Sequence, residues 1–487
     1  MLPPDSHRRF RLLRAACLVL IPLTAVAAWF AVQPGDRLCA PESRFLLPAL
    51  VYDEFDLAAM ALRGLNAERD RLPGRADNPY ESWYEPPLGV RLASDRPLKR
   101  RYFLEYPHAA LLLFRVGYWI QPSARNLSIP PALADTDYHD VAMHLPATVR
   151  EAELWRSFVV ASQFYVAVML VCLLLLMAIL EWGYGGGLHG GSLLLLLPAF
   201  LYFTLNRYDI VPAMLTALSL ACLGRRWHTA SGLTLAAAAL VKVYPVLLAP
   251  LIVRYLWSNR RDAGKWSIAF AGGCSLALTP LLFGSDLEAV LAPYRFQLTR
   301  PPELGMTIYG CFLPVQLGSG ALGAVFRTAV LGGTLAALLR SPILDLTSLL
   351  RRGALFLLVF VSVAVFYSPQ WVIWFAPLLF PLARTDRRLG WSVITFDLIT
   401  YLTFPVAFWI SPIVSEYCLK EVMPLEDVNL WNSRLAIAVL VVLRFLRFVL
   451  IGIMGWQLIR AEWPHILTGS WLARRSPRLA WFLMQKL

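Results

Sequence analysis

The chain has 487 residues, of which 58% are hydrophobic and 16% are charged, and its formal net charge is +13 at pH 7. A soluble protein of this length needs far more polar surface around its core, so the composition excludes a water-soluble globular protein. The apolar residues come in uniform blocks of about 17–25, which predicts membrane-spanning helices and excludes the alternating strands of a barrel.

The positive charge is gathered in short segments between the apolar blocks. This distribution indicates cytoplasmic loops and argues against a nucleic-acid partner. The basic pairs are Arg8-Arg9, Arg225-Arg226, Arg260-Arg261, Arg351-Arg352, Arg387-Arg388 and Arg474-Arg475.

The spans are predicted in chain order from these blocks. The first, at about 12–32, has a basic start and no good cleavage site, so we expect a retained signal anchor with the N-terminus inside. A long segment at 35–155 then lies at the outer face. Six later spans are expected at about 156–181, 190–205, 209–224, 230–243, 245–257 and 266–284. The next span ends near Arg340, and the last four are expected at about 353–367, 371–383, 391–411 and 435–457. We therefore predict one all-α polytopic transmembrane domain, 1–487, of about twelve helices, with a second outer loop at 285–317 and a cytoplasmic tail at 458–487.

Three pairs of predicted spans have almost no connecting loop. Their junctions, at 206–209, 242–245 and 368–370, carry polar residues or proline at the outer end of the helices. Broken helices are tolerated in a membrane only where they are buried in protein or line a wet cavity. The sequence therefore predicts a polar cavity at the outer face.

Lys242 is the most informative residue of these junctions, because it lies within a long apolar run. An ionisable side chain in such a place indicates function, whereas the alternative is a lysine that extends to the membrane surface. Tyr244-Pro245 interrupts the helix directly after it, which favours function. A lysine at this depth suits a lipid phosphate, as a point charge with mobile donors.

Further charged residues are predicted near the same cavity. Arg207 and Asp209 flank Tyr208, and a structural ion pair that caps the helix is the alternative for them. In the first outer segment, Asp53 and Asp56 have the chemistry of a general base, although composition alone favours an ordinary solvated acidic turn.

Several segments together carry a family resemblance. They are 206–213 followed by 232–245, then 294–301 with Arg295 and Arg300, and 368–377, preceded by a looser pattern of an aspartate near 53, Pro79-Tyr80 and Glu105-Tyr106-Pro107. In order and spacing they resemble bacterial polyprenyl-phosphate-mannose-dependent mannosyltransferases, which are glycosyltransferase family 87 in the C-type superfamily and include the phosphatidylinositol-mannoside mannosyltransferases.

The resemblance implies an enzyme of the bacterial plasma membrane whose active site faces the outside. A hexose, mannose in that family, would pass with inversion from a polyprenyl-phosphate donor to a lipid-linked or envelope glycan acceptor. Asp53 or Asp56 would be the base, and cations would stabilise the leaving phosphate without a metal or cofactor. The implied phosphate-binding residues are Lys242, Arg207, Arg295 and Arg300. The implied substrate-binding residues are Tyr244, Asp209, Glu105, Tyr106 and Gln370.

Two other functions stay open from the sequence. One is transfer of another sugar, such as glucose, arabinose or an N-acylated sugar. The other is a transporter or flippase for a lipid-linked sugar, which would also need broken helices. The acceptor is open as well, because His108 stands where the family has a second proline and residues 120–150 form an apparent insertion.

Overall fold

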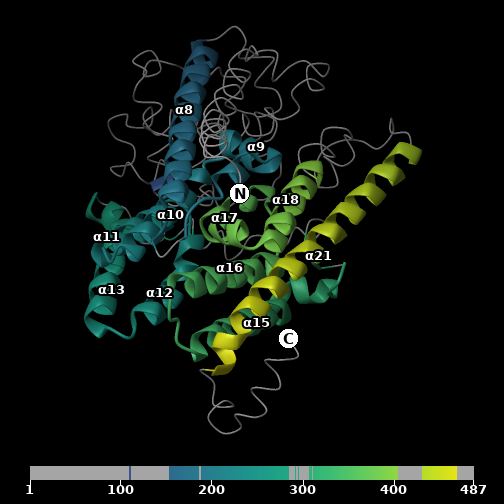
Figure 1. The fold of residues 1–487 in the computed structure, drawn as a ribbon. Coiled ribbons are helices and arrows are strands. Elements are labelled where there is room, and N and C mark those ends of the chain that lie inside the picture. The colour runs from purple at the N-terminus through teal and green to yellow at the C-terminus, as the bar shows by residue number, and fades with distance from the viewer. Residues whose placement is uncertain are drawn as a thin grey trace, which may run out of the picture.

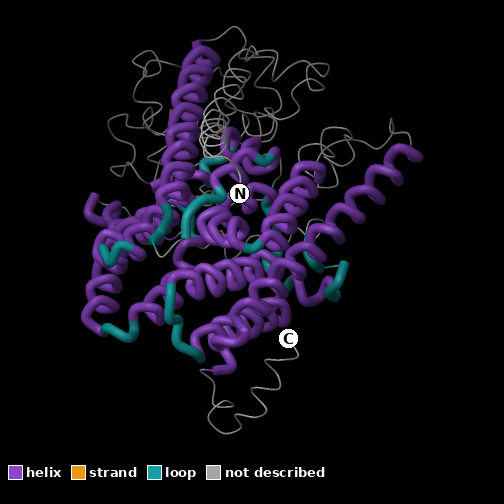
Figure 2. The backbone as a smooth tube through the Cα atoms, viewed as in Figure 1, coloured by secondary structure: helices purple, strands orange, loops and turns teal. Residues whose placement is uncertain are grey.

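The protein is described from a computed structural model. The structure describes residues 109–110, 153–185, 188–283, 291, 294, 307–309, 311–403 and 430–468. Within these ranges every regular element is a helix, and β pairing is limited to one isolated bridge between Tyr309 and Leu313 (Figure 2). The predicted all-α class is confirmed for this part of the chain.

The described elements are α-helices of various lengths with short 3-10 helices among them (Figure 1). The α-helices are α8 (Glu153–Trp182), α9 (Pro198–Asn206), α10 (Ile210–Gly224), α11 (His228–Val241), α12 (Ala249–Leu256), α13 (Arg260–Cys274), α15 (Gly320–Arg340), α16 (Leu346–Val363), α17 (Ala376–Thr385), α18 (Arg387–Tyr401) and α21 (Leu430–Thr468). The 3-10 helices are η4 (Ser192–Leu196), η5 (Tyr244–Leu248), η6 (Ser275–Phe283), η8 (Val315–Gly318) and η9 (Pro369–Phe375).

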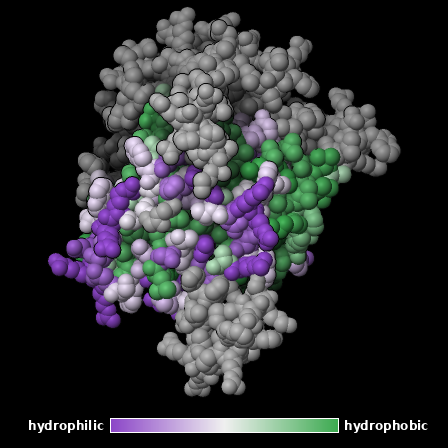
Figure 3. All heavy atoms as spheres, in the orientation of Figure 1, coloured by the Kyte–Doolittle hydropathy of each residue, from purple (hydrophilic) through white to green (hydrophobic). Residues whose placement is uncertain are grey.

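Three stretches of the described helices are long and apolar enough to cross a membrane, at Gly320–Arg340, Leu346–Val363 and Ala438–Glu462. The described chain also has shorter apolar helices, among them Ile210–Gly224 and His228–Val241. Apolar side chains of α21 remain exposed, among them Val442, and Figure 3 shows a broad hydrophobic face on that side. This surface is typical of a helical membrane protein, since a soluble bundle would cover it with polar residues.

In the described part of the chain, basic turns lie close together at one end of the bundle, which we call the arginine-rich end. Arg225 donates to the carbonyl oxygen of Gly183 at 3.0 Å, and Arg254 donates to that of Leu339 at 2.9 Å. A Cβ on Gly224 would overlap the carbonyl oxygen of Tyr184, so α10 can end against the turn after α8 only with glycine there. The basic turns are thus neighbours in space.

Two helices that start at this end, α13 and α18, begin with a side-chain cap. Asn259 accepts from the backbone N–H of Arg261, and Asp386 accepts from those of Arg388 and Leu389. An acceptor at this position satisfies N–H groups that have no partner in the first turn of a helix. The caps therefore mark where α13 and α18 begin, directly at their arginine pairs.

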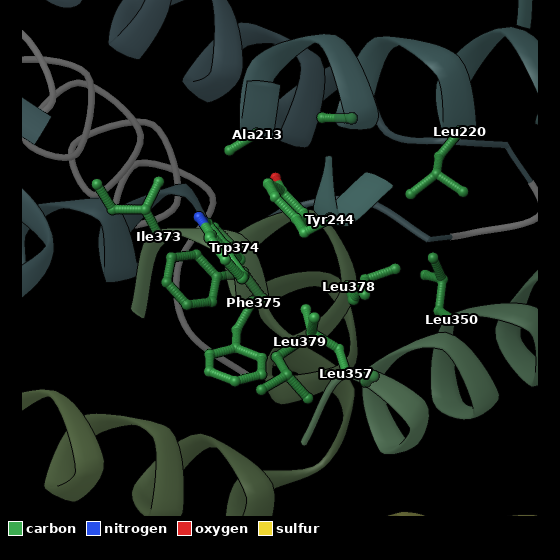
Figure 4. Packing of buried hydrophobic residues seen from close by; sticks show 14 of the residues in the cluster. Ala213, Leu220, Tyr244, Leu350, Leu357, Ile373, Trp374, Phe375, Leu378 and Leu379 are labelled. Carbon is green, nitrogen blue, oxygen red and sulfur yellow. The ribbon is translucent and has the colours of Figure 1, made fainter. Parts of the chain in front are cut away.

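The continuous segment of η9 and α17 lies at the centre of the bundle. Every residue from Gln370 to Ala383 is buried. Figure 4 shows its side chains Trp374, Phe375 and Leu378 packed among residues of α10, η5 and α16. This segment places aromatic side chains beside the helix junctions that the sequence singled out.

Candidate functional site

A proline in the first turn after each helix junction helps to explain the three breaks. Pro212 lies in the first turn of α10, Pro245 in η5 and Pro369 at the start of η9. Proline has no N–H to bond to the preceding turn, but it is tolerated at the start of a helix. The chain therefore stops one helix and starts another at each of these points.

At two of the breaks the backbone is extended at a basic residue. Arg207 ends α9 with φ −134° and ψ 143°, and Lys242 ends α11 with φ −154° and ψ 135°. Arg207, Tyr208 and Asp209 are all buried between α9 and α10. The two breaks therefore bring charged side chains into the interior of the bundle.

The breaks meet at an ion pair. Lys242 Nζ lies 2.6 Å from Asp209 Oδ1 and donates to it. Trp374 Nε1, from η9, donates to the same oxygen at 2.5 Å. The side chain of Asp209 is fully buried, whereas 15% of the Lys242 side chain is exposed. All three predicted breaks thus contribute to one cluster of Asp209, Lys242 and Trp374, which we call the break cluster.

Aromatic rings surround the lysine of the break cluster. Lys242 Nζ lies 4.8 Å from the centre of the Tyr208 ring and 5.4 Å from that of Trp374. Tyr244 stacks on Trp374 with the ring centres 4.3 Å apart and the planes 7° from parallel (Figure 4). The ring faces stabilise an ammonium group, most strongly where water is excluded. The lysine is therefore held as a cation within an aromatic setting.

No protein-family model, curated protein or solved structure matches the chain.

The structure brings together three of the predicted site residues, Lys242, Asp209 and Tyr244. Arg207 is buried two residues before Asp209, and Gln370 is buried on η9. Asp209 directly precedes α10, but its side chain makes no capping hydrogen bond to that helix and pairs with Lys242.

The other predicted site residues lie outside the described part of the chain. These are Asp53, Asp56, Glu105, Tyr106, Arg295 and Arg300.

Trp374 was missed by the sequence reasoning, although its motif was recognised. Its indole donates to a carboxylate 165 positions earlier in the chain. The available signal was the tryptophan pair at 371 and 374, one helical turn apart beside a break. Their rings stack at 4.7 Å, so both belong to the aromatic wall of the break cluster.

Two arginines of α21 were also missed. Arg447 is fully buried, with Cζ 3.7 Å from the centre of the Tyr367 ring. Arg444 donates from Nε to Cys311 Sγ at 2.8 Å. The Tyr367 ring lies 5.7 Å from that of Trp371, so Arg447 connects to the break cluster through the aromatic wall. Arginine inside a predicted span was itself the signal.

Proposed function

We propose that the protein is a membrane glycosyltransferase. It transfers a hexose, mannose by the family resemblance, from a polyprenyl-phosphate donor to a lipid-linked or envelope glycan acceptor. The observation that carries this proposal is the buried pair of Lys242 and Asp209 within aromatic rings at the meeting point of three helix breaks.

The proposed membrane orientation has twelve spans and places the break cluster at the outer face of the bacterial plasma membrane. The arginine-rich end then lies in the cytoplasm, as the positive-inside rule requires. Exposed tryptophans neighbour the basic turns in sequence, among them Trp227, Trp257 and Trp391. Tryptophan is enriched at membrane–water interfaces, which supports this end of the bundle as one membrane surface.

Physical cost supports a functional role for the break cluster. Burying a charged pair costs several kcal/mol per ion by order of magnitude, and well-packed apolar residues are often as stable. Ionisable groups inside a membrane are rare and typically mark a substrate path. A cation held in a water-poor site also stabilises the negative charge that develops on a departing phosphate more strongly than it would in water.

The proposed reaction is a displacement at the anomeric carbon. The base, Asp53 or Asp56, takes the proton of an acceptor hydroxyl, and that oxygen forms a bond to the anomeric carbon. The bond from this carbon to the phosphate oxygen breaks, and the polyprenyl phosphate leaves with the electron pair. Lys242, Arg207, Arg295 and Arg300 stabilise the phosphate. Tyr244, Asp209, Gln370, Glu105 and Tyr106 bind substrate.

The test is transfer by purified full-length protein in lipid nanodiscs. Polyprenyl-phospho-mannose with a radiolabelled sugar is supplied together with a membrane glycolipid extract as acceptor. We expect labelled glycolipid of inverted anomeric configuration, and at least tenfold less of it with Lys242→Met. Lys265→Met, at an exposed position of α13, is the matched control and should retain full transfer.

Other results would point to the remaining functions. Transfer only from glucosyl, arabinosyl or N-acylated donors would keep the enzyme class and change the sugar. Movement of an intact donor across a proteoliposome membrane, without any transfer, would replace the proposal with a flippase.

A further inference from the structure

Asp209 uses only one of its two carboxylate oxygens. Oδ1 accepts from both Lys242 Nζ and Trp374 Nε1. Oδ2 is buried as well, and no donor among the described residues reaches it. A buried acceptor without a hydrogen bond is costly, and more so when it carries charge. This oxygen of Asp209 can therefore accept a hydrogen bond from a donor that the described chain does not supply.

The donor substrate limits what that group can be. A polyprenyl phosphosugar is a phosphodiester whose phosphate is ionised at neutral pH and offers only acceptors. The polyprenyl chain offers neither donors nor acceptors. Sugar hydroxyls are the remaining groups, and each can donate one hydrogen bond. A carboxylate repels the phosphate and accepts from a hydroxyl.

We propose that Asp209 recognises the hexose of the donor, with Oδ2 accepting a hydrogen bond from one sugar hydroxyl. This inference rests on the proposed function, because it assumes a polyprenyl phosphosugar as ligand. Lys242 and Trp374 hold the carboxylate in place through Oδ1, which leaves Oδ2 oriented for the sugar. In this arrangement Lys242 Nζ binds one oxygen of the carboxylate and the sugar hydroxyl binds the other, and Lys242 Nζ also faces the phosphate. The pair thereby positions the two halves of the donor head group.

The experiment measures binding without acceptor, so that only the donor is present. The probes are polyprenyl-phospho-mannose, its monodeoxy analogues, and the methyl diester of the same polyprenyl phosphate, which has no sugar. We expect at least one monodeoxy analogue to bind the wild-type protein about 10- to 100-fold more weakly than the mannosyl donor. In Asp209→Asn that ratio should fall severalfold, because a charged acceptor has been replaced by a neutral amide.

Two controls separate sugar recognition from general damage. The methyl diester should bind wild-type protein and Asp209→Asn within about threefold of each other. Lys265→Met, at an exposed position of α13, should retain the selectivity against the deoxy analogue. If Asp209→Asn does not fold, Asp209→Asn with Lys242→Met removes both buried charges and takes its place.

Each outcome decides between the two proposals. If the wild-type protein binds every monodeoxy analogue within about threefold of the mannosyl donor, the role of Asp209 is overturned while glycosyl transfer stands. The role of Asp209 is also overturned if Asp209→Asn discriminates against the monodeoxy analogue as strongly as the wild-type protein does. If the wild-type protein binds none of the diesters, the proposed function itself fails.

Discussion

The ion pair of Lys242 and Asp209 differs from that of Arg352 and Glu462 in what surrounds the cation. The first lies at the helix breaks, where the rings of Tyr208 and Trp374 lie beside Lys242 Nζ. The second lies at the arginine-rich end, where α16 meets the far end of α21. The carboxylates of both pairs are buried, whereas 15% of the Lys242 side chain is exposed and that of Arg352 is fully buried.

The guanidinium group of Arg352 donates hydrogen bonds to one carboxylate and to three backbone carbonyl oxygens. Its Nε donates to Glu462 Oε1 at 2.8 Å. Its Nη1 donates to the carbonyl oxygens of Leu338 at 2.7 Å and Ser341 at 2.9 Å, and its Nη2 donates to that of Pro342 at 3.2 Å. These bonds hold the end of α15 and the turn after it against α16. The arrangement is that of a structural clamp.

Glu462 accepts through one oxygen. Ser348 donates to Oε1 as well as Arg352, whereas Oε2 has no hydrogen-bond donor among the described residues and lies 3.8 Å from Arg351 Nη1. The two pairs therefore differ in the cation: Arg352 donates to backbone carbonyls that join helices, whereas Lys242 lies beside aromatic rings at the meeting point of the breaks. A buried ion pair is therefore informative about function only when the partners of its cation are considered.

The largest expected effect comes from Arg352→Met. The substitution leaves Glu462 buried without its main counter-charge. It also removes the guanidinium group that donates hydrogen bonds to three backbone carbonyl oxygens. We expect the free energy of unfolding to fall by about 3–5 kcal/mol. Thermal unfolding of the purified protein in detergent measures this. Arg351→Gln is the control, because that side chain is 27% exposed and the expected loss is under about 1 kcal/mol. Equal losses in the two variants would contradict the clamp.

The break cluster should respond differently when both charges are removed. Lys242→Met leaves Asp209 buried without its counter-charge and should destabilise the protein by about 3–5 kcal/mol. Adding Asp209→Asn removes that charge, so the double variant should regain at least half of the lost stability. Transfer should nevertheless remain about 10²–10³-fold below wild type, because the cation beside the phosphate is gone.

Unfolding and transfer measured on the same preparations test this separation. Recovery of transfer together with stability would mean that the pair is only structural. The pair of Lys242 and Asp209 would then have the same structural role as the pair of Arg352 and Glu462.

A smaller effect is expected from Trp374→Phe. The substitution removes one donor to Asp209 Oδ1 and keeps an aromatic ring beside Tyr244. We expect a loss of about 1.5–3 kcal/mol, the range for a hydrogen bond to a charged group. Trp391→Phe, at a position that is 58% exposed, should change the unfolding free energy by less than about 0.5 kcal/mol. If Trp374→Phe lowers the unfolding free energy no more than Trp391→Phe does, the indole of Trp374 does not stabilise the break cluster.

Much of the helical arrangement could be predicted from the sequence. The expected spans at 156–181 and 209–224 correspond closely to α8 and α10. The breaks were predictable because proline and polar residues interrupt otherwise apolar runs. The division of several spans into a 3-10 segment and a short α-helix was not, because hydropathy does not distinguish the two kinds of helix.

The partners within the site could not be predicted in the same way. The sequence placed Arg207 beside Asp209, whereas the structure pairs Asp209 with Lys242, 33 positions later. Contacts of this kind depend on how helices pack, and no local pattern records them. Arg444 and Arg447 were overlooked for a related reason, since two charges in a long apolar block barely lower its hydropathy.

A structure of the protein with polyprenyl-phospho-mannose bound tests the central claim most directly. We predict a phosphate oxygen about 2.7–2.9 Å from Lys242 Nζ, the range of a charge-assisted hydrogen bond, and a mannose hydroxyl on Asp209 Oδ2. Donor density with its phosphate more than about 10 Å from Lys242, roughly one helix diameter, would contradict the account.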